Sequence, residues 1–188
     1  MSRRRSVFRS IFLSALAGAS VAACFIDSPT EDAEIEALGP ELPDVAPSEF
    51  HRPGQPCTTC HDEYGPGNPV FSVGGTVFAT NVDKVPVEGA TVTLTDSRGE
   101  VRTAVTNCVG NFFIEDATFR PVYPMGVTVD CPLTGPVAMQ SLINREGSCA
   151  FCHANQPSPT SAGWVYCAVA DPDAPPPPAN PNCPGRVP

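Results

Sequence analysis

The chain has 188 residues, enough for one modest domain with tails, and its nine cysteines indicate an oxidising compartment outside the cytoplasm. Eleven basic residues stand against 20 acidic ones, a net charge of −9 that argues against nucleic acid as a partner. The 23 prolines exceed ordinary usage and predict extended, irregular flanks.

Segment 1–23 has the pattern of an export signal. A basic start precedes an apolar stretch, Ile11–Ala23, which is too short to span a bilayer as a helix. Its end, Val21-Ala22-Ala23-Cys24, resembles the lipobox of bacterial lipoproteins. The resemblance implies cleavage before Cys24, acylation of that thiol, and lipid anchoring in the bacterial cell envelope, whether periplasm, outer membrane or cell surface. The alternative is an ordinary signal peptide that leaves Cys24 a plain thiol.

Segment 24–50 is acidic and poor in aromatic residues, so we expect a disordered tether, with room for a short helix near residues 31–38. Removal of segment 1–23 would take away four arginines and shift the net charge from −9 to −13. Such a surface would suit a basic partner protein.

Segment 51–69 shows no periodicity and is expected to be a loop. In segment 70–131, short β-branched runs alternate with turn signals, which predicts a mainly β fold, a small antiparallel β-sandwich. Ala90, Val92 and Leu94 should share one face of it. The expected strands fall within residues 70–80, 90–95, 101–106, 112–114 and 126–130.

The same stretch, from Gly75-Thr76-Val77 through Val87-Glu88-Gly89-Ala90-Thr91-Val92 and Asp96-Ser97-Arg98-Gly99 to Gly110-Asn111-Phe112, resembles a known domain. It is similar to the carboxypeptidase regulatory-like (transthyretin-like) β-sandwich of secreted bacterial proteins. The likeness covers about a third of the chain and implies a fold without a peptidase site.

Segment 132–170 is expected to be irregular apart from a short helix over 137–144. Segment 171–188 contains four consecutive prolines and predicts an extended polyproline II tail.

Two pentapeptides, Cys57-Thr58-Thr59-Cys60-His61 and Cys149-Ala150-Phe151-Cys152-His153, lie on either side of the predicted sandwich. In the spacing Cys-x-x-Cys-His, two thiols can form thioethers with the two vinyl groups of one haem, and the histidine can reach its iron. The motifs resemble those of multihaem c-type cytochromes.

The resemblance implies two covalently bound haems, with Cys57, Cys60, Cys149 and Cys152 as attachment points and His61 and His153 as proximal iron ligands. The expected function is electron transfer to redox partner proteins by a carrier that is not an enzyme.

The chain has few candidates for the sixth ligand of each haem iron, because His51 is the one histidine outside the two motifs. His51 stands six residues before Cys57, which suggests that it is too close in sequence to reach the distal face of the haem attached at Cys57 and Cys60. We therefore expect His51 to bind the iron of the second haem. The first haem would take Met139, Met125, a ligand from another copy of the chain, or none, so self-association is a further hypothesis.

If Cys24 carries lipid and four cysteines hold haem, four cysteines remain: Cys108, Cys131, Cys167 and Cys183. They could form two disulfides, in any of three pairings. If the strand after 111–115 returns antiparallel, Cys131 ends beside Cys108. This predicts Cys108–Cys131 and, by elimination, Cys167–Cys183.

Two other functions use the same motifs. In an adhesion or polymer-binding lipoprotein, the CxxC pairs would bind zinc or form disulfides. In a haem peroxidase-like enzyme, a five-coordinate iron would need an acid–base residue on its open side. The sequence shows no βαβ context around either motif, which argues against a thioredoxin-like enzyme.

Overall fold

The structure is a computed structural model that describes residues 29–41, 45–154, 161–169, 171, 173, 178 and 180–184. The export signal 1–23 and Cys24 lie outside the described residues, as does much of the proline-rich tail. The lipobox therefore stays a prediction. Within the described ranges, no helix is long and apolar enough to cross a membrane.

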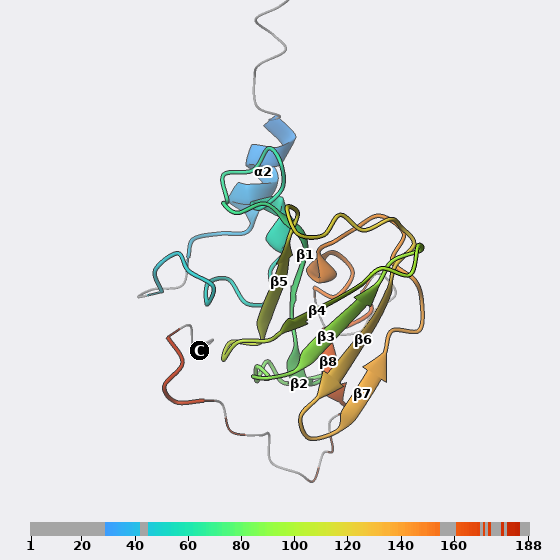
Figure 1. The fold of residues 1–188 in the computed structure, drawn as a ribbon. Helices are drawn as coiled ribbons and strands as arrows, with labels where there is room; N and C mark the ends of the chain where they lie inside the picture. The colour runs from blue at the N-terminus through green and yellow to red at the C-terminus, as the bar shows by residue number, and fades with distance from the viewer. Residues whose placement is uncertain are drawn as a thin grey trace, which may run out of the picture.

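The fold is mainly β, as the sequence predicts (Figure 1). One antiparallel sheet has the strand order β4-β3-β6-β7, and two strand pairs, β1-β5 antiparallel and β2-β8 parallel, complete the fold. The strands are β1 (Phe71–Thr76), β2 (Phe78–Thr80), β3 (Thr91–Thr95), β4 (Val101–Val105), β5 (Asn111–Glu115), β6 (Gly126–Cys131), β7 (Gly135–Ala138) and β8 (Tyr166–Ala168).

The core lies between the four-stranded sheet and the β1-β5 pair. Val92 and Leu94 of β3 are fully buried, and Ala90 beside them is buried too, which confirms the predicted face. From the opposite layer, β1 contributes Val73, and β5 contributes Phe112 and Ile114. Alternation along each strand sends every second side chain into this common core.

Strand β7 replaces the helix predicted over 137–144. It pairs with β6, where Val129 faces Val137, and the backbone N–H of Met139 extends the pairing by donating to Val127 O at 3.0 Å. A short isolated helix is marginal in water, whereas the free edge of β6 offers a row of backbone partners. Strand β8 is not predicted from the sequence, because a run of three residues is too short to show a periodic pattern.

The disulfides join Cys108 to Cys183 and Cys131 to Cys167. The count of two is right, but both predicted pairings, Cys108–Cys131 and Cys167–Cys183, are wrong. The reason is topological: β5 pairs with β1, and the next strand, β6, joins the other sheet. Cys131 at the end of β6 therefore meets Cys167 of β8, while Cys108 holds Cys183 of the C-terminal segment.

The acidic segment contains the expected short helix, α2 (Pro29–Ala37). Its C-terminal end is attached to the domain, since Arg52 donates to Gly39 O at 2.8 Å and pairs with Glu41 at 2.8 Å. Gln55 also donates to Leu38 O at 3.1 Å. Residues 38–41 thus pack on the first Cys-x-x-Cys-His segment and are not part of a free tether.

Candidate functional site

Both Cys-x-x-Cys-His motifs adopt the same local structure. Each begins with a 3-10 turn, η2 (Cys57–Thr59) or η3 (Cys149–Phe151), and an extended residue precedes it. The N–H of His61 donates to Cys57 O at 3.0 Å, and the N–H of His153 donates to Cys149 O at 2.9 Å. Two segments with different neighbours therefore place their thiols and imidazole alike.

Each motif histidine is fixed through one ring nitrogen. Nδ1 of His61 lies 2.8 Å from Pro69 O, and Nδ1 of His153 lies 2.5 Å from Gly163 O. A carbonyl oxygen only accepts, so Nδ1 is the donor in both rings, and in the neutral tautomer with that hydrogen Nε2 has a lone pair. This is the arrangement in which proteins present a histidine to a metal.

The loop after the first motif folds back over His61. Gly67 N–H donates to Cys60 O at 2.6 Å, and Phe71 N–H donates to His61 O at 2.7 Å. A Cβ on Gly67 would lie 2.8 Å from the His61 ring, so only glycine allows this approach. As a result His61 is only 8% exposed.

An aromatic stack supports the His61 ring. The ring lies parallel to Phe71 with centroids 4.1 Å apart, and Phe71 stacks on Phe113 at 4.5 Å. Phe71 belongs to β1 and Phe113 to β5, so the sheet itself sets the plane of the imidazole.

The two motifs meet at strand β1 (Figure 1). A Cβ on Gly74 would lie 3.1 Å from Cys57 Sγ, and one on Gly75 would lie 2.9 Å from Cys149 Sγ. Successive residues of a strand face opposite sides, so the two thiols flank one strand at neighbouring positions. The sequence contained a signal for this, because glycine inside a strand often marks a close approach.

A backbone link holds the second motif in this place. Gly74 N–H donates to Gly147 O at 3.1 Å. A Cβ on Gly147 would lie 2.0 Å from Ser72 O, so the segment before Cys149 can approach β1 only with glycine there.

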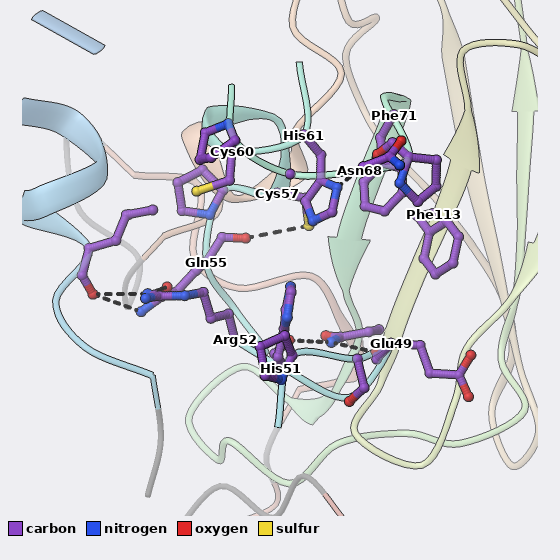
Figure 2. Close-up of a pocket in the computed structure, with 18 of the residues that line it drawn as sticks. Glu49, His51, Arg52, Gln55, Cys57, Cys60, His61, Asn68, Phe71 and Phe113 are labelled. Carbon is purple, nitrogen blue, oxygen red and sulfur yellow. Dashed lines mark hydrogen bonds between the residues drawn. The ribbon is translucent and has the colours of Figure 1, made fainter. Parts of the chain in front are cut away.

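A pocket of about 470 Å³ opens beside the first motif (Figure 2). This volume is within the range of cofactor sites. Residues lining it include Cys57, Cys60, His61, His51 and Phe113.

The structure places His51 beside the first motif. Its ring centroid lies 5.8 Å from that of His61, and both residues line the pocket at the first motif. The chain between His51 and Cys57 folds back at Arg52, whose φ is +48°, so closeness in sequence does not keep His51 away from the first motif. Burial is the main cause that lowers its pKa and favours the neutral ring.

Neither methionine candidate lines the pocket at the first motif. Met125 is fully buried in the core. Met139 follows β7 at the edge of the four-stranded sheet, whereas both motifs contact β1 in the other layer. Met139 is also not among the residues that line the pocket.

The partly buried thiols of Cys57, Cys60 and Cys149 favour an uncharged sulfur. Burial raises the pKa of Cys57 to about 11 and that of Cys149 to about 12, and it also raises the pKa of Cys60. A thioether carries no charge and suits such a place, whereas a nucleophilic thiol needs a lowered pKa. All four motif cysteines are outside disulfides.

In the part of the chain that the structure describes, no three histidine, cysteine, aspartate or glutamate side chains form a group that could hold a metal ion. A structural zinc site needs four such ligands. A c-type haem iron is held by only one or two protein side chains, alongside its porphyrin.

Comparisons of this chain with protein-family models, with curated proteins and with solved structures found no match.

Proposed function

We propose that this chain is a di-haem c-type cytochrome that carries electrons in the bacterial cell envelope. Cys57 and Cys60 would hold one haem, and Cys149 and Cys152 the other, with His61 and His153 as their iron ligands. The observation that carries the proposal is the shared state of the two histidines, each with Nδ1 bound to a backbone carbonyl and Nε2 left for a metal.

When bound, the haem supplies a one-electron couple, and the protein supplies ligands, orientation and exclusion of water. Around the first motif, the Phe71 and Phe113 rings orient His61 and shield it. The Gly67 turn covers the same histidine. Desolvation of the partly buried Cys57 and Cys149 favours uncharged sulfur.

The placement of the two motifs supports exchange of electrons between the haems. Their first cysteines pack on Gly74 and Gly75, consecutive residues of β1. The second motif is the more exposed: Phe151 is 50% exposed and Cys152 is also exposed, whereas His61 is buried. This favours the second haem as the point where redox partner proteins dock.

We propose an electron carrier rather than an enzyme, anchored through Cys24 if the lipobox is used. The zinc alternative lacks a ligand group among the described residues. The peroxidase alternative has no observation in its favour.

The test is production of the full chain in a host with a cytochrome c maturation system. We expect a red protein with an α-band on reduction and an intact mass above that of the polypeptide by two haems. C57A/C60A and C149A/C152A should each remove one haem, while M139L should remove none. A colourless protein, or one that holds zinc through these cysteines, would overturn the proposal.

A further inference from the structure

We propose that His51 is the second axial ligand of the haem at the first motif, on the same iron as His61. The inference rests on the proposed function and deepens it, because it names both iron ligands of one haem and so distinguishes the two haems.

The spacing of the two rings fits one iron between them. Metal–imidazole bonds are about 2.0–2.1 Å long, so two rings on opposite sides of one ion have centroids roughly 6.4 Å apart. The centroids of His51 and His61 are 5.8 Å apart. The planes are tilted by 41°, which axial ligation permits because each ring can rotate about its bond to the metal.

The pocket is lined by the groups that a haem at the first motif would need. Figure 2 shows His51 on the side of the pocket opposite Cys60 and His61. The attachment cysteines, the proximal histidine and His51 thus line one space, as a haem attached at Cys57 and Cys60 would require.

The backbone around His51 is firmly held. Asn111 Nδ2 donates to His51 O at 2.9 Å, which ties this residue to the start of β5. Arg52 has φ +48°, a left-handed conformation that persists only where neighbours enforce it. Hydrogen bonds from Arg52 to Glu41 and Gln55 enforce it here, at 2.8 and 2.7 Å.

The Nδ1 atom of His51 differs from that of the other two histidines. Its Nδ1 is buried and, among the described residues, has no hydrogen-bond partner. The other two histidines each use Nδ1 to bond a carbonyl. Buried polar atoms nearly always have partners, so this exception needs an explanation. His51 is thus the histidine whose ring no carbonyl holds through Nδ1, so the ring can rotate to bring Nε2 to an iron in the pocket.

The experiment isolates the first haem in the variant C149A/C152A and compares it with the same protein carrying His51→Ala. We expect a low-spin, six-coordinate spectrum in the parent and a high-spin spectrum after the substitution, by absorption and by electron paramagnetic resonance. Added imidazole should restore the low-spin form. Haem content by mass and far-ultraviolet circular dichroism should stay unchanged.

The matched control is C57A/C60A, which keeps only the second haem. His51→Ala should leave its spectrum unaltered. If it alters that spectrum, or leaves that of the first haem unaltered, the inference is wrong while the proposed function stands. A parent protein without haem would instead remove the proposed function.

A second substitution covers the case in which His51→Ala does not fold. His51→Met keeps a ligand of similar reach and should raise the reduction potential of the first haem, because methionine ligation raises haem potentials relative to histidine. A potential unchanged from that of the parent would overturn the inference.

Discussion

Thr58 Oγ1 donates to Glu146 Oε1 at 3.2 Å, so a residue inside the first Cys-x-x-Cys-His motif is bonded to the segment that leads into the second. The same carboxylate oxygen accepts the N–H of Ser148 at 2.7 Å, directly before Cys149. One side chain therefore couples the positions of both motifs.

Glu146→Ala should lower the free energy of unfolding by about 1–3 kcal/mol, because it removes two hydrogen bonds to a charged group, one of them fixing the turn at Cys149. Thr58→Ala should lower the free energy of unfolding by less, because it removes only the hydrogen bond between Thr58 and Glu146. A double-mutant cycle in urea measures the coupling between the two. Glu63→Ala, at an exposed position next to the first motif, is the control and should change stability by less than about 0.5 kcal/mol. Additive effects of the two substitutions would contradict the coupling.

The Cys131–Cys167 disulfide should be the principal covalent support of the core. Both sulfurs are buried, and the bond ties β6 to β8. Replacing both residues by alanine should lower the free energy of unfolding by about 2–5 kcal/mol. Peptide mapping without reduction should find Cys131 with Cys167 and Cys108 with Cys183. Recovery of a Cys108–Cys131 peptide would show that the topology described here is wrong.

Gly75→Ala should disturb the second motif more than the first. The added Cβ would lie 2.8 Å from Cys149 Cβ, too near for either group to stay in place. We expect overpacking to lower the free energy of unfolding by about 1–3 kcal/mol. Intact mass should also show a larger fraction of protein that carries only one haem. Gly126→Ala, where the nearest atom is 3.7 Å away, is the matched control and should keep both haems. Equal haem content in the two variants would count against the packing of Cys149 on β1.

Asp96 should make the stability depend on pH. Its buried carboxylate accepts the N–H groups of Arg98, Glu100 and Val122 at 2.8, 2.9 and 3.0 Å. Desolvation by itself would raise its pKa, but these bonds and the Arg98 charge outweigh it, and the pKa is lowered. A lowered folded-state pKa stabilises the fold above the unfolded-state value of about 3.9 and ceases to do so as the pH falls through the folded-state value.

Asp96→Asn should therefore reduce the urea midpoint at pH 7, and the difference from the parent should shrink between about pH 5 and pH 3. Asp130→Asn, at an exposed position on β6, serves as control. A difference that stays constant across this range would mean that the carboxylate charge contributes nothing.

The sequence by itself determined the features that depend on local pattern. Alternating apolar residues gave the strands around Val92 and Leu94, because one face of a strand must be buried whatever it packs against. The fixed spacing Cys-x-x-Cys-His predicted the two candidate sites at His61 and His153, since the local turn sets the backbone geometry of each motif.

Only the tertiary structure decided which distant segments meet. The crossing from β5 to β6 between layers set the pairing of Cys131 with Cys167, and no local signal encodes that choice. The turn at Arg52 placed His51 beside His61, against the expectation from its nearness in sequence. Gly74 and Gly75 brought both motifs to one strand, because close approach depends on the room that a missing side chain leaves once the chain has folded.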